Sequence, residues 1–460
     1  MFEKTIAAVS TPRGTGGIAV IRISGEDALL ISEKFIKAKS GKNLSDIEPR
    51  KVFSADIYGD GELLDTALVT IFRTPHSFTG EDTVEISCHG GALLTAQILA
   101  SAIAHGAVQA GPGEFTRRAF SSGKLTLSEA EGISELISAK STAALRISNQ
   151  NAHGALAKEI NEIYSDIKTV LSAVYAGIDF PDEDLADIGA EQMTRETENI
   201  REKLAALKNS YKTGHAIVEG IKTVICGKPN TGKSTLLNLL CKSDRAIVTD
   251  IAGTTRDTIT ETVVCGNAAL ILSDTAGIHD TDDMIEGIGV GRSIKAIDDA
   301  ELILAVFDIS RPLDADDEKI VEKIKSCRAS GAYAVALTNK TDLCKNPYKF
   351  KYEDDFDKTM AISACDKKYY DVISDMISNI FSCGEIGDAE SATVTTARQY
   401  AKICAALESM TSALDALSAG HIDAAGMELE GAMSVLGELD GRSVGIDIVD
   451  DIFSKFCVGK

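Results

Sequence analysis

A short glycine-rich segment restricts the fold of this chain more than any other feature. Residues 227–234 read GKPNTGKS and match the pattern GxxxxGKS, with the apolar run TVIC before them and the helix-forming run STLLNLL at their end. A strand, a glycine-rich loop and a helix in this order form a phosphate-binding loop, whose backbone N–H groups face the phosphates. Lys233 would then reach the outer phosphates as a catalytic residue, and Ser234 would ligate magnesium. The sequence therefore predicts a parallel α/β domain around a nucleotide site.

Three further motifs follow in the order that a guanine-nucleotide site requires. DTAG at 274–277 follows the apolar run ALILS, and it is expected to place a carboxylate near magnesium and an N–H group at the terminal phosphate. NKTD at 339–342 ends the run AVALT, and SAC at 363–365 resembles the last guanine-contacting loop. The Asp342 carboxylate can accept two hydrogen bonds from the N–H edge of guanine, whereas adenine would leave it unpaired. GTP or GDP with Mg²⁺ is the predicted ligand.

The loop DIAGTTRD lies between the phosphate-binding loop and DTAG and carries Thr255, the candidate for a mobile second magnesium ligand. An ordinary loop threonine is the alternative at that position. The residues that these motifs predict to contact the nucleotide are Asn230, Thr231, Gly232, Lys233, Ser234, Thr235, Thr254, Thr255, Asp274, Thr275, Ala276, Gly277, Asn339, Lys340, Thr341, Asp342, Ser363, Ala364 and Cys365.

The residue after DTAG is Ile278, where many related switches have a glutamine that positions the attacking water. An aliphatic side chain cannot do this, and the sequence offers no obvious arginine finger. Hydrolysis therefore requires another cation for the developing charge and another group for the water.

Composition excludes several classes of protein. The net charge of −22 argues against a broadly basic surface for nonspecific nucleic-acid binding, although residues 1–120 are nearly balanced, with 12 Lys and Arg against 14 Asp and Glu. The ten cysteines form no CxxC pair and no zinc-ligand cluster. The N-terminus resembles neither a signal nor a transit peptide, so we expect a cytoplasmic protein. Glu85 to Glu114 enclose a long stretch without charge. We expect a packed helix there and no membrane span, with an apolar face made by Leu93, Leu94, Ile98, Leu99 and Ile103.

Apolar spacing divides the chain into four parts. Short strands such as 18–23 and 68–72 alternate with Gly/Pro turns near the front. Apolar residues at steps of three and four predict long helices at 127–147, 156–178, 191–211, 401–417 and 424–439. We therefore predict a multidomain α/β fold, in which a P-loop GTPase domain is inserted into a helical domain and an α+β domain precedes both. The predicted boundaries are 1–119 for the front domain, 120–218 and 386–460 for the helical domain, and 219–385 for the GTPase domain.

Motifs along the whole chain resemble those of the MnmE (TrmE) family of tRNA-modification GTPases. TPRGTGGIAVIRISG is similar to the opening of the family, and SFTGEDTVEISCHGG, PGEFTRRAF, GKLTLSEAEGISELI and GIDFPDED follow in the expected order. DIAGTTRD and DTAG lie in the GTPase part, and the chain ends in FCVGK.

The resemblance implies a front domain that binds a tetrahydrofolate derivative, such as 5-formyltetrahydrofolate, and through which the protein forms a homodimer. It also implies an FAD-dependent partner subunit, MnmG (GidA), and tRNA whose wobble uridine is modified at carbon 5. Potassium bound between phosphates and protein would activate hydrolysis when two GTPase domains meet.

The same resemblance implies roles for individual residues. Asn230, Thr249, Thr254 and the backbone carbonyl of Ile251 would ligate potassium, within a nucleotide-contacting loop that also includes Asp250, Ala252 and Gly253. Glu286 would orient the attacking water, although on the residues alone it reads as a solvated loop acid. The folate residues would be Arg22, Glu81, Lys124 and Lys460, each of which reads as a surface ion-pair residue without the family. Cys457 is either a catalytic thiol or a passive cysteine.

Two other functions stay open at this stage. The chain could be a regulatory GTPase switch in RNA or ribosome maturation, or a folate-dependent methyl or aminomethyl transferase timed by GTP. The folate signatures count against the first, and only the substrate distinguishes the second from a tRNA-modifying enzyme.

Overall fold

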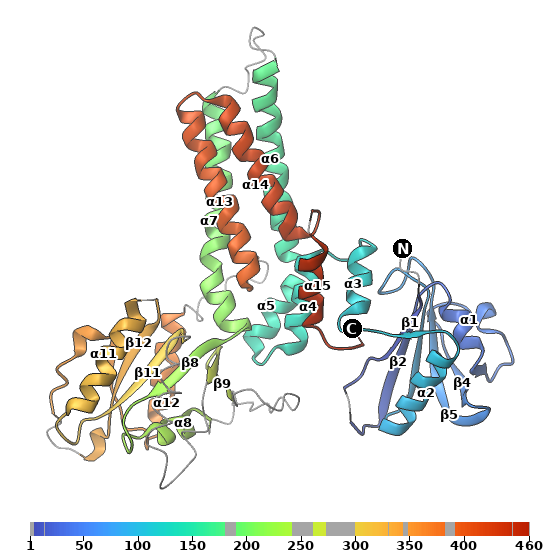
Figure 1. Cartoon of the computed structure of the whole chain (residues 1–460), viewed down its shortest axis with the longest axis horizontal. Helices are drawn as coiled ribbons and strands as arrows, with labels where there is room; N and C mark the ends of the chain where they lie inside the picture. Colours follow the sequence, from blue (N-terminus) through green and yellow to red (C-terminus); the bar gives the residue numbers. More distant parts are fainter. Residues whose placement is uncertain are drawn as a thin grey trace. The chain divides into compact units, whose positions relative to one another are not determined.

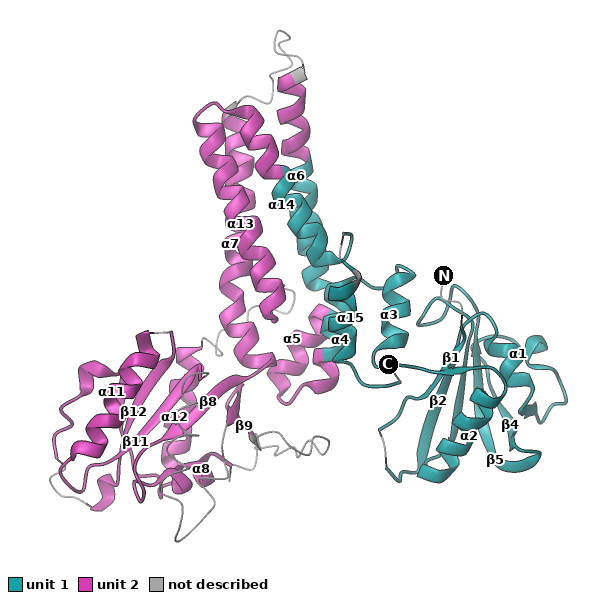
Figure 2. Ribbon diagram, viewed as in Figure 1, with its two compact units in different colours: residues 1–134, 152–168, 430–460 teal, residues 135–151, 169–429 magenta. Residues whose placement is uncertain are grey.

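The computed structural model describes residues 4–12, 14–179, 190–241, 261–272, 300–329, 331–343, 348–381, 392–443 and 445–459. The chain divides into two compact units (Figure 2), each formed by segments that are distant in sequence. Unit 1 comprises Met1–Ser134, Ala152–Lys168 and Glu430–Lys460, and unit 2 comprises Glu135–Asn151 and Thr169–Leu429.

The front of the chain folds into a seven-stranded sheet in unit 1, with the strand order β3-β4-β5-β6-β2-β1-β7. Its strands are β1 (Ile6–Val9), β2 (Ile18–Ser24), β3 (Ile36–Ala38), β4 (Val52–Gly59), β5 (Glu62–Phe72), β6 (Thr83–His89) and β7 (Val108–Gln109). The pairs are antiparallel except for β1 with β7, which is parallel. The predicted strands at 18–23 and 68–72 are confirmed as parts of β2 and β5.

The two faces of this sheet differ because side chains alternate along each strand. On one face, Ile21, Ile23 and Ile86 pack into a core with α1 (Ala28–Glu33) and α2 (Ala92–Ala104). The opposite face carries Arg22 and Glu85, which are direct neighbours across the β2–β6 pair. This face is therefore the one opposite the α1/α2 layer; Figure 1 shows both helices beside the front sheet.

Helix α2 confirms the packed helix expected between Glu85 and Glu114, but the expected apolar face is wrong in part. The buried residues of the helix are Thr95, Ile98, Ser101 and Ala102. Leu93 is 74% exposed and Ile103 39% exposed. At about 100° per residue, both project about 140° away from Ile98, so neither can share its buried face.

The C-terminal segment of unit 1 packs against the start of α3 (Glu114–Ser121). Helix α15 (Ile446–Ser454) contacts α3. After α15, Val458 forms an isolated antiparallel bridge with Pro112, and the backbone N–H of Gly113 donates to the carbonyl oxygen of Cys457 at 3.2 Å. Residues 457 and 458 therefore lie beside residues 112 and 113.

Long helices precede and follow the second α/β region in the sequence. They are α4 (Leu127–Ser138), α5 (Thr142–Ala152), α6 (Ala155–Asp179), α7 (Ala190–Val218), α13 (Ala397–Ser418) and α14 (Ile422–Asp440). The single helix expected at 127–147 is wrong, because the chain breaks between α4 and α5. Ser141 ends the break: its hydroxyl accepts the backbone N–H of Ala144 at 3.0 Å and so caps α5. Among the helices that the structure describes, none has the length and apolar character that a membrane span requires.

The α/β region of unit 2 contains a six-stranded sheet in the order β13-β12-β11-β8-β10-β9. All pairs are parallel except β10 with β9. The strands are β8 (Ile221–Cys226), β9 (Glu261–Cys265), β10 (Ala268–Leu272), β11 (Leu302–Asp308), β12 (Tyr333–Asn339) and β13 (Lys358–Ala361), and the helices are α8 (Lys233–Cys241), α11 (Ala315–Ala329) and α12 (Lys368–Ile380). The predicted mixed α/β fold is confirmed. Both glycine-rich and guanine-reading motifs follow the carboxyl ends of parallel strands, where such sheets bind ligands.

Candidate functional site

The phosphate-binding loop connects β8 to α8 and leaves no room for a side chain at Gly232. This residue has φ of +103°, and an added Cβ would lie 2.2 Å from Nδ2 of Asn339. Asn230 also adopts the left-handed region, with φ of +61°. The loop is therefore a tight turn without room for a side chain at Gly232, and such a turn lets backbone N–H groups face phosphates.

Lys233 begins α8 and folds back over this loop. Its ammonium group donates to the backbone carbonyl of Lys228 at 2.7 Å, and the hydroxyl of Thr231 donates to the same carbonyl at 2.9 Å. Burial lowers the pKa of Lys233. The positive charge is thus held above the loop and at the N-terminal end of a helix, where an anion is stabilised.

Asn339 links the phosphate-binding loop, the 339–342 loop and the 363–365 loop. Its side chain is 3% exposed. Its amide N–H donates to the carbonyl oxygen of Thr231 in the phosphate-binding loop at 2.8 Å, and its amide oxygen accepts the backbone N–H of Ala364 at 2.9 Å. One buried amide therefore links the phosphate loop to the 339–342 and 363–365 loops, where the guanine base is expected.

The rest of the guanine-reading loop is held by local contacts. Lys340 has φ of +69°, and its ammonium group donates to Asp308 at 2.7 Å. Burial opposes ionisation of Asp308, but hydrogen bonds from Lys340 and Ser310 outweigh it and lower the pKa of Asp308. The hydroxyl of Thr341 donates to the carbonyl of Ile362 at 3.0 Å. These contacts fix the loop while leaving Asp342 exposed to a ligand.

The 363–365 loop places its first two residues inside and its third outside. Ser363 is 5% exposed and Ala364 4% exposed, whereas Cys365 is exposed. The described part of the predicted nucleotide site is therefore assembled from separate loops of unit 2. The remaining predicted residues of this site lie outside the described residues: Thr249, Asp250, Ile251, Ala252, Gly253, Thr254, Thr255, Asp274, Thr275, Ala276, Gly277 and Glu286.

A second cluster in unit 1 brings together the predicted folate residues Arg22, Glu81 and Lys124. Ser24 lies two residues after Arg22 on the same face of β2, and its hydroxyl donates to Glu81 at 2.9 Å. An added Cβ at Gly80 would lie 3.6 Å from Cε of Lys124, which places this lysine beside the Glu81 loop. The fourth residue, Lys460, lies outside the described residues.

Arg22 is held from several sides. Its guanidinium Nε donates to Glu85 at 2.9 Å. The rings of Phe78 and Phe115 lie 5.5 and 5.4 Å from the guanidinium carbon, within the range of cation–π attraction. The side chain of Arg22 is 18% exposed, so part of the cation still reaches solvent.

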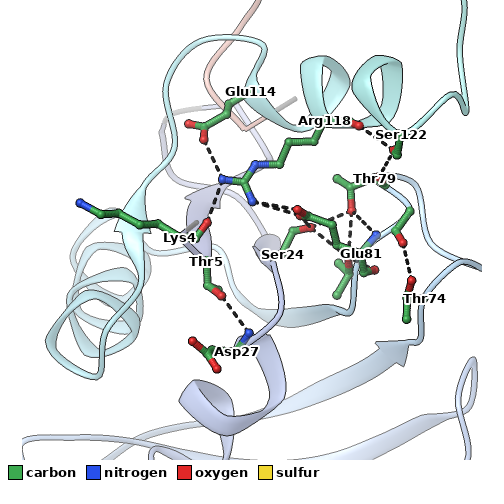
Figure 3. Close-up of polar contacts among 12 residues, drawn as sticks. Lys4, Thr5, Ser24, Asp27, Thr74, Thr79, Glu81, Glu114, Arg118 and Ser122 are labelled. Atoms are coloured by element: carbon green, nitrogen blue, oxygen red, sulfur yellow. Dashed lines mark hydrogen bonds and ion pairs between the residues drawn. The ribbon is translucent and has the colours of Figure 1, made fainter. Parts of the chain in front are cut away.

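Arg118 belongs to this cluster, although the sequence motifs did not predict it as a site residue. It lies within the PGEFTRRAF motif, is 2% exposed, and pairs with Glu81 at 3.1 Å (Figure 3). Ser24 was missed as well. No local sequence pattern indicated either residue, because the burial of Arg118 and its need for a carboxylate partner follow from contacts between distant segments.

Cys457 is exposed, and its backbone carbonyl accepts the N–H of Gly113. The backbone of Cys457 is thus anchored and its thiol is accessible. Both interpretations of this residue, a catalytic thiol and a passive cysteine, stay predictions.

Comparison with known proteins decides the family. A family model described as GTP-binding protein TrmE N-terminus matches residues 5–124, and one described as MnmE helical domain matches residues 127–457. The tRNA modification GTPase MnmE of Lactococcus lactis subsp. cremoris (strain SK11) is 39% identical over 458 residues, which cover 99% of this chain and 98% of that protein. This chain belongs to the MnmE family.

A second MnmE, from Clostridioides difficile (strain 630), is 37% identical over 463 residues and covers 100% of both chains. A solved structure of Era from Aquifex aeolicus is 23% identical and covers 41% of this chain and 66% of that one, with a TM-score of 0.26. As a member of the MnmE family matched along its whole length, the chain is a GTPase that acts in tRNA modification. The predicted GTP-binding function is confirmed.

Proposed function

We propose that this MnmE-family chain is a potassium-activated GTPase that modifies carbon 5 of the wobble uridine in tRNA, using a one-carbon unit from a tetrahydrofolate derivative. An FAD-dependent MnmG (GidA) subunit acts as its partner. The observation that carries the proposal is the polar cluster of Arg22, Glu81 and Lys124 in unit 1, because its donor set fits a folate. A carboxylate suits the N–H edge of the pterin ring, and two cations suit the glutamate carboxylates.

The end of the chain supports a fourth folate contact. An added Cβ at Gly459 would lie 2.3 Å from the carbonyl oxygen of Val9, so the C-terminal backbone packs tightly against β1. Ala8 on the same strand pairs with Arg22 on β2. A cationic Lys460 that follows Gly459 is well suited to bind a folate carboxylate. We propose the same folate role for this residue as for Arg22.

At the nucleotide site, Lys233 and the N-terminus of α8 would hold the phosphates, and Ser234 with Thr255 would hold Mg²⁺. We propose that Asn230 ligates potassium together with Thr249, Thr254 and the carbonyl of Ile251. This ion supplies the positive charge that other GTPases take from an arginine.

Glu286 orients the attacking water in this proposal, since Ile278 cannot. The remaining contacts of the switch loop come from residues 249–255, and those of the terminal phosphate from residues 274–277. Hydrolysis would then depend on the approach of two GTPase domains, one from each chain. We propose that each of these domains comprises residues 219–385.

The open face of the front sheet supports a homodimer. Ile18, Val52 and Leu68 are 71%, 63% and 52% exposed, and the strand register places all three on the face opposite the α1/α2 core. Exposed apolar side chains that share one face of a sheet suit packing against another chain. We propose that this face forms the contact between two copies.

The function is tested by mass spectrometry of wobble nucleosides in total tRNA from a strain that lacks this gene. We expect loss of the carboxymethylaminomethyl or aminomethyl group from uridine, and its return when the gene is restored. A deletion strain with unchanged wobble nucleosides would instead favour a regulatory GTPase switch. The potassium role is tested separately by GTP turnover in potassium and in sodium, and equal rates would remove the proposed role of Asn230.

A further inference from the structure

The Glu81 carboxylate already has three hydrogen-bond contacts before any ligand is considered (Figure 3). Nη1 of Arg118 lies 3.2 Å from Oε1 and 3.1 Å from Oε2, and the hydroxyl of Ser24 donates to Oε2 at 2.9 Å. An ionised carboxylate has about four acceptor positions. One position therefore remains, on Oε1, whereas a ligand with two parallel N–H donors needs one on each oxygen.

The contacts of Arg118 are the fixed part of this arrangement. Its second terminal nitrogen donates to the carbonyl of Lys4 at 2.9 Å and to Glu114 at 3.0 Å. Glu114 in turn accepts the backbone N–H of Gly111 at 2.8 Å. A buried guanidinium held from three sides cannot move without leaving charges unpaired, so it fixes the orientation of Glu81.

Ser24 is the adjustable part. Its hydroxyl oxygen lies 2.7 Å from Oγ1 of Thr79, and either atom can be the donor. Oγ1 of Thr79 also accepts the backbone N–H of Glu81 at 3.2 Å, which leaves it one more acceptor position. If the Thr79 hydroxyl turns its proton from Ser24 toward Oγ1 of Thr83, 3.5 Å away, the Ser24 hydroxyl can turn its own proton from Glu81 to Thr79, which frees the second acceptor on Oε2.

We infer that Arg118 is the positioning residue that presents Glu81 to the paired N–H edge of the pterin ring, and that Ser24 releases Glu81 when the ligand binds. This inference rests on the proposed folate function. Arg118 does not contact the folate in this arrangement but acts through the Glu81 carboxylate. Its replacement should therefore weaken binding most for a ligand that has both N–H donors.

The test uses the full chain and isothermal titration calorimetry, since the protein has no tryptophan to report binding. The ligands are 5-formyltetrahydrofolate and its 2-desamino analogue, which lacks one donor of the N–H edge. For the first ligand, we expect Arg118→Gln to weaken binding about 10- to 100-fold, and Arg118→Lys to recover part of that loss. Ser24→Ala should bind at least as tightly as the unaltered chain, because it removes a competitor for Oε2.

The matched control is Arg73→Gln. Arg73 pairs with Asp82, the residue after Glu81, at 2.8 Å and is partly exposed, but it does not contact Glu81. This variant should bind 5-formyltetrahydrofolate like the unaltered chain. Thermal unfolding of every variant separates loss of binding from loss of the fold.

The two ligands distinguish positioning from a general structural role. If Arg118 acts through Glu81, the Gln variant loses more affinity for 5-formyltetrahydrofolate than for the 2-desamino analogue, which keeps only one N–H donor for the carboxylate. An equal loss for both ligands, or a Ser24→Ala variant that binds at least 10-fold more weakly, would overturn the inference while leaving the folate function in place. Failure of the unaltered chain to bind 5-formyltetrahydrofolate would overturn the proposed folate function and this inference with it. Should Arg118→Gln fail to fold, the comparison of both ligands with Arg118→Lys and Ser24→Ala decides.

Discussion

Replacing Asn339 with aspartate changes one buried atom at the centre of the nucleotide site. The carboxylate can still accept the backbone N–H of Ala364, which the native amide oxygen accepts at 2.9 Å. The other oxygen would face the carbonyl oxygen of Thr231, which the native N–H group meets at 2.8 Å. The substitution therefore breaks the link to the phosphate loop and keeps the link to the 363–365 loop.

The cost follows from the burial of this residue, which is 3% exposed. Loss of a hydrogen bond removes about 1 kcal/mol, and leaving buried polar partners unsatisfied costs about 1–3 kcal/mol more. Because the loops must keep their arrangement to bind the nucleotide, a total of about 2–4 kcal/mol weakens GDP binding about 30- to 1000-fold.

Calorimetric titration of GDP into the full chain with Mg²⁺ measures this effect. Asn379→Asp is the matched control, because it makes the same chemical change at an exposed position of α12 and should bind GDP normally. Thermal unfolding must show that both variants are folded. A folded Asn339→Asp variant that binds GDP within threefold of the unaltered chain would refute the linking role of the amide.

Three further predictions concern other groups of unit 2. Glu219 and Glu301, whose carboxylates lie 3.1 and 3.0 Å from the ring nitrogens of His215, raise its pKa from the usual 6.5 to about 9. The imidazolium should therefore stabilise the fold by about 1–3 kcal/mol, an amount fully present below pH ~6.5 and lost as pH rises through ~9. Urea unfolding of His215→Gln and the unaltered chain should give a difference that shrinks over this range, and a constant difference would contradict it. Asp342→Asn should lower GTP affinity at least about 100-fold and favour xanthine nucleotides in competition binding, because the amide reverses one hydrogen-bonding position; retained guanine preference would refute the base contact. Asn230→Ala should make GTP turnover in potassium fall to the rate in sodium, whereas persistent potassium stimulation would place the ion elsewhere.

Local sequence patterns predicted the parts of the fold that depend on neighbours in the chain. The strand, glycine-rich loop and helix around residues 227–234 follow from apolar spacing and from the conformations that glycine permits. The break between α4 and α5 was missed, because apolar spacing continues through 127–147 and only the cap at Ser141 interrupts the helix. The apolar face of α2 was misjudged at Leu93, where the position around the helix outweighs hydrophobicity.

Contacts between residues that are distant in the sequence could not be predicted from local patterns. Arg118 and Glu81 are 37 residues apart, and Ser24 and Glu81 are 57 apart, so no helical or strand periodicity relates them. Their contact depends on how α3 packs beside the loop before β6. The amide of Asn339 and the carbonyl of Thr231 are 108 residues apart. The NKTD motif predicted that Asn339 serves the site, but it could not predict which backbone atoms the side chain joins.

The most direct test restores the gene to a deletion strain in altered forms and measures wobble nucleosides of total tRNA by mass spectrometry. In the proposed function, a single modification requires both the nucleotide site in unit 2 and the Glu81 cluster in unit 1. We predict that the unaltered gene and the Asn379→Asp control restore modified uridine, and that Asn339→Asp and Glu81→Gln, expressed at equal levels, do not. Full restoration by either of these two variants would contradict the account.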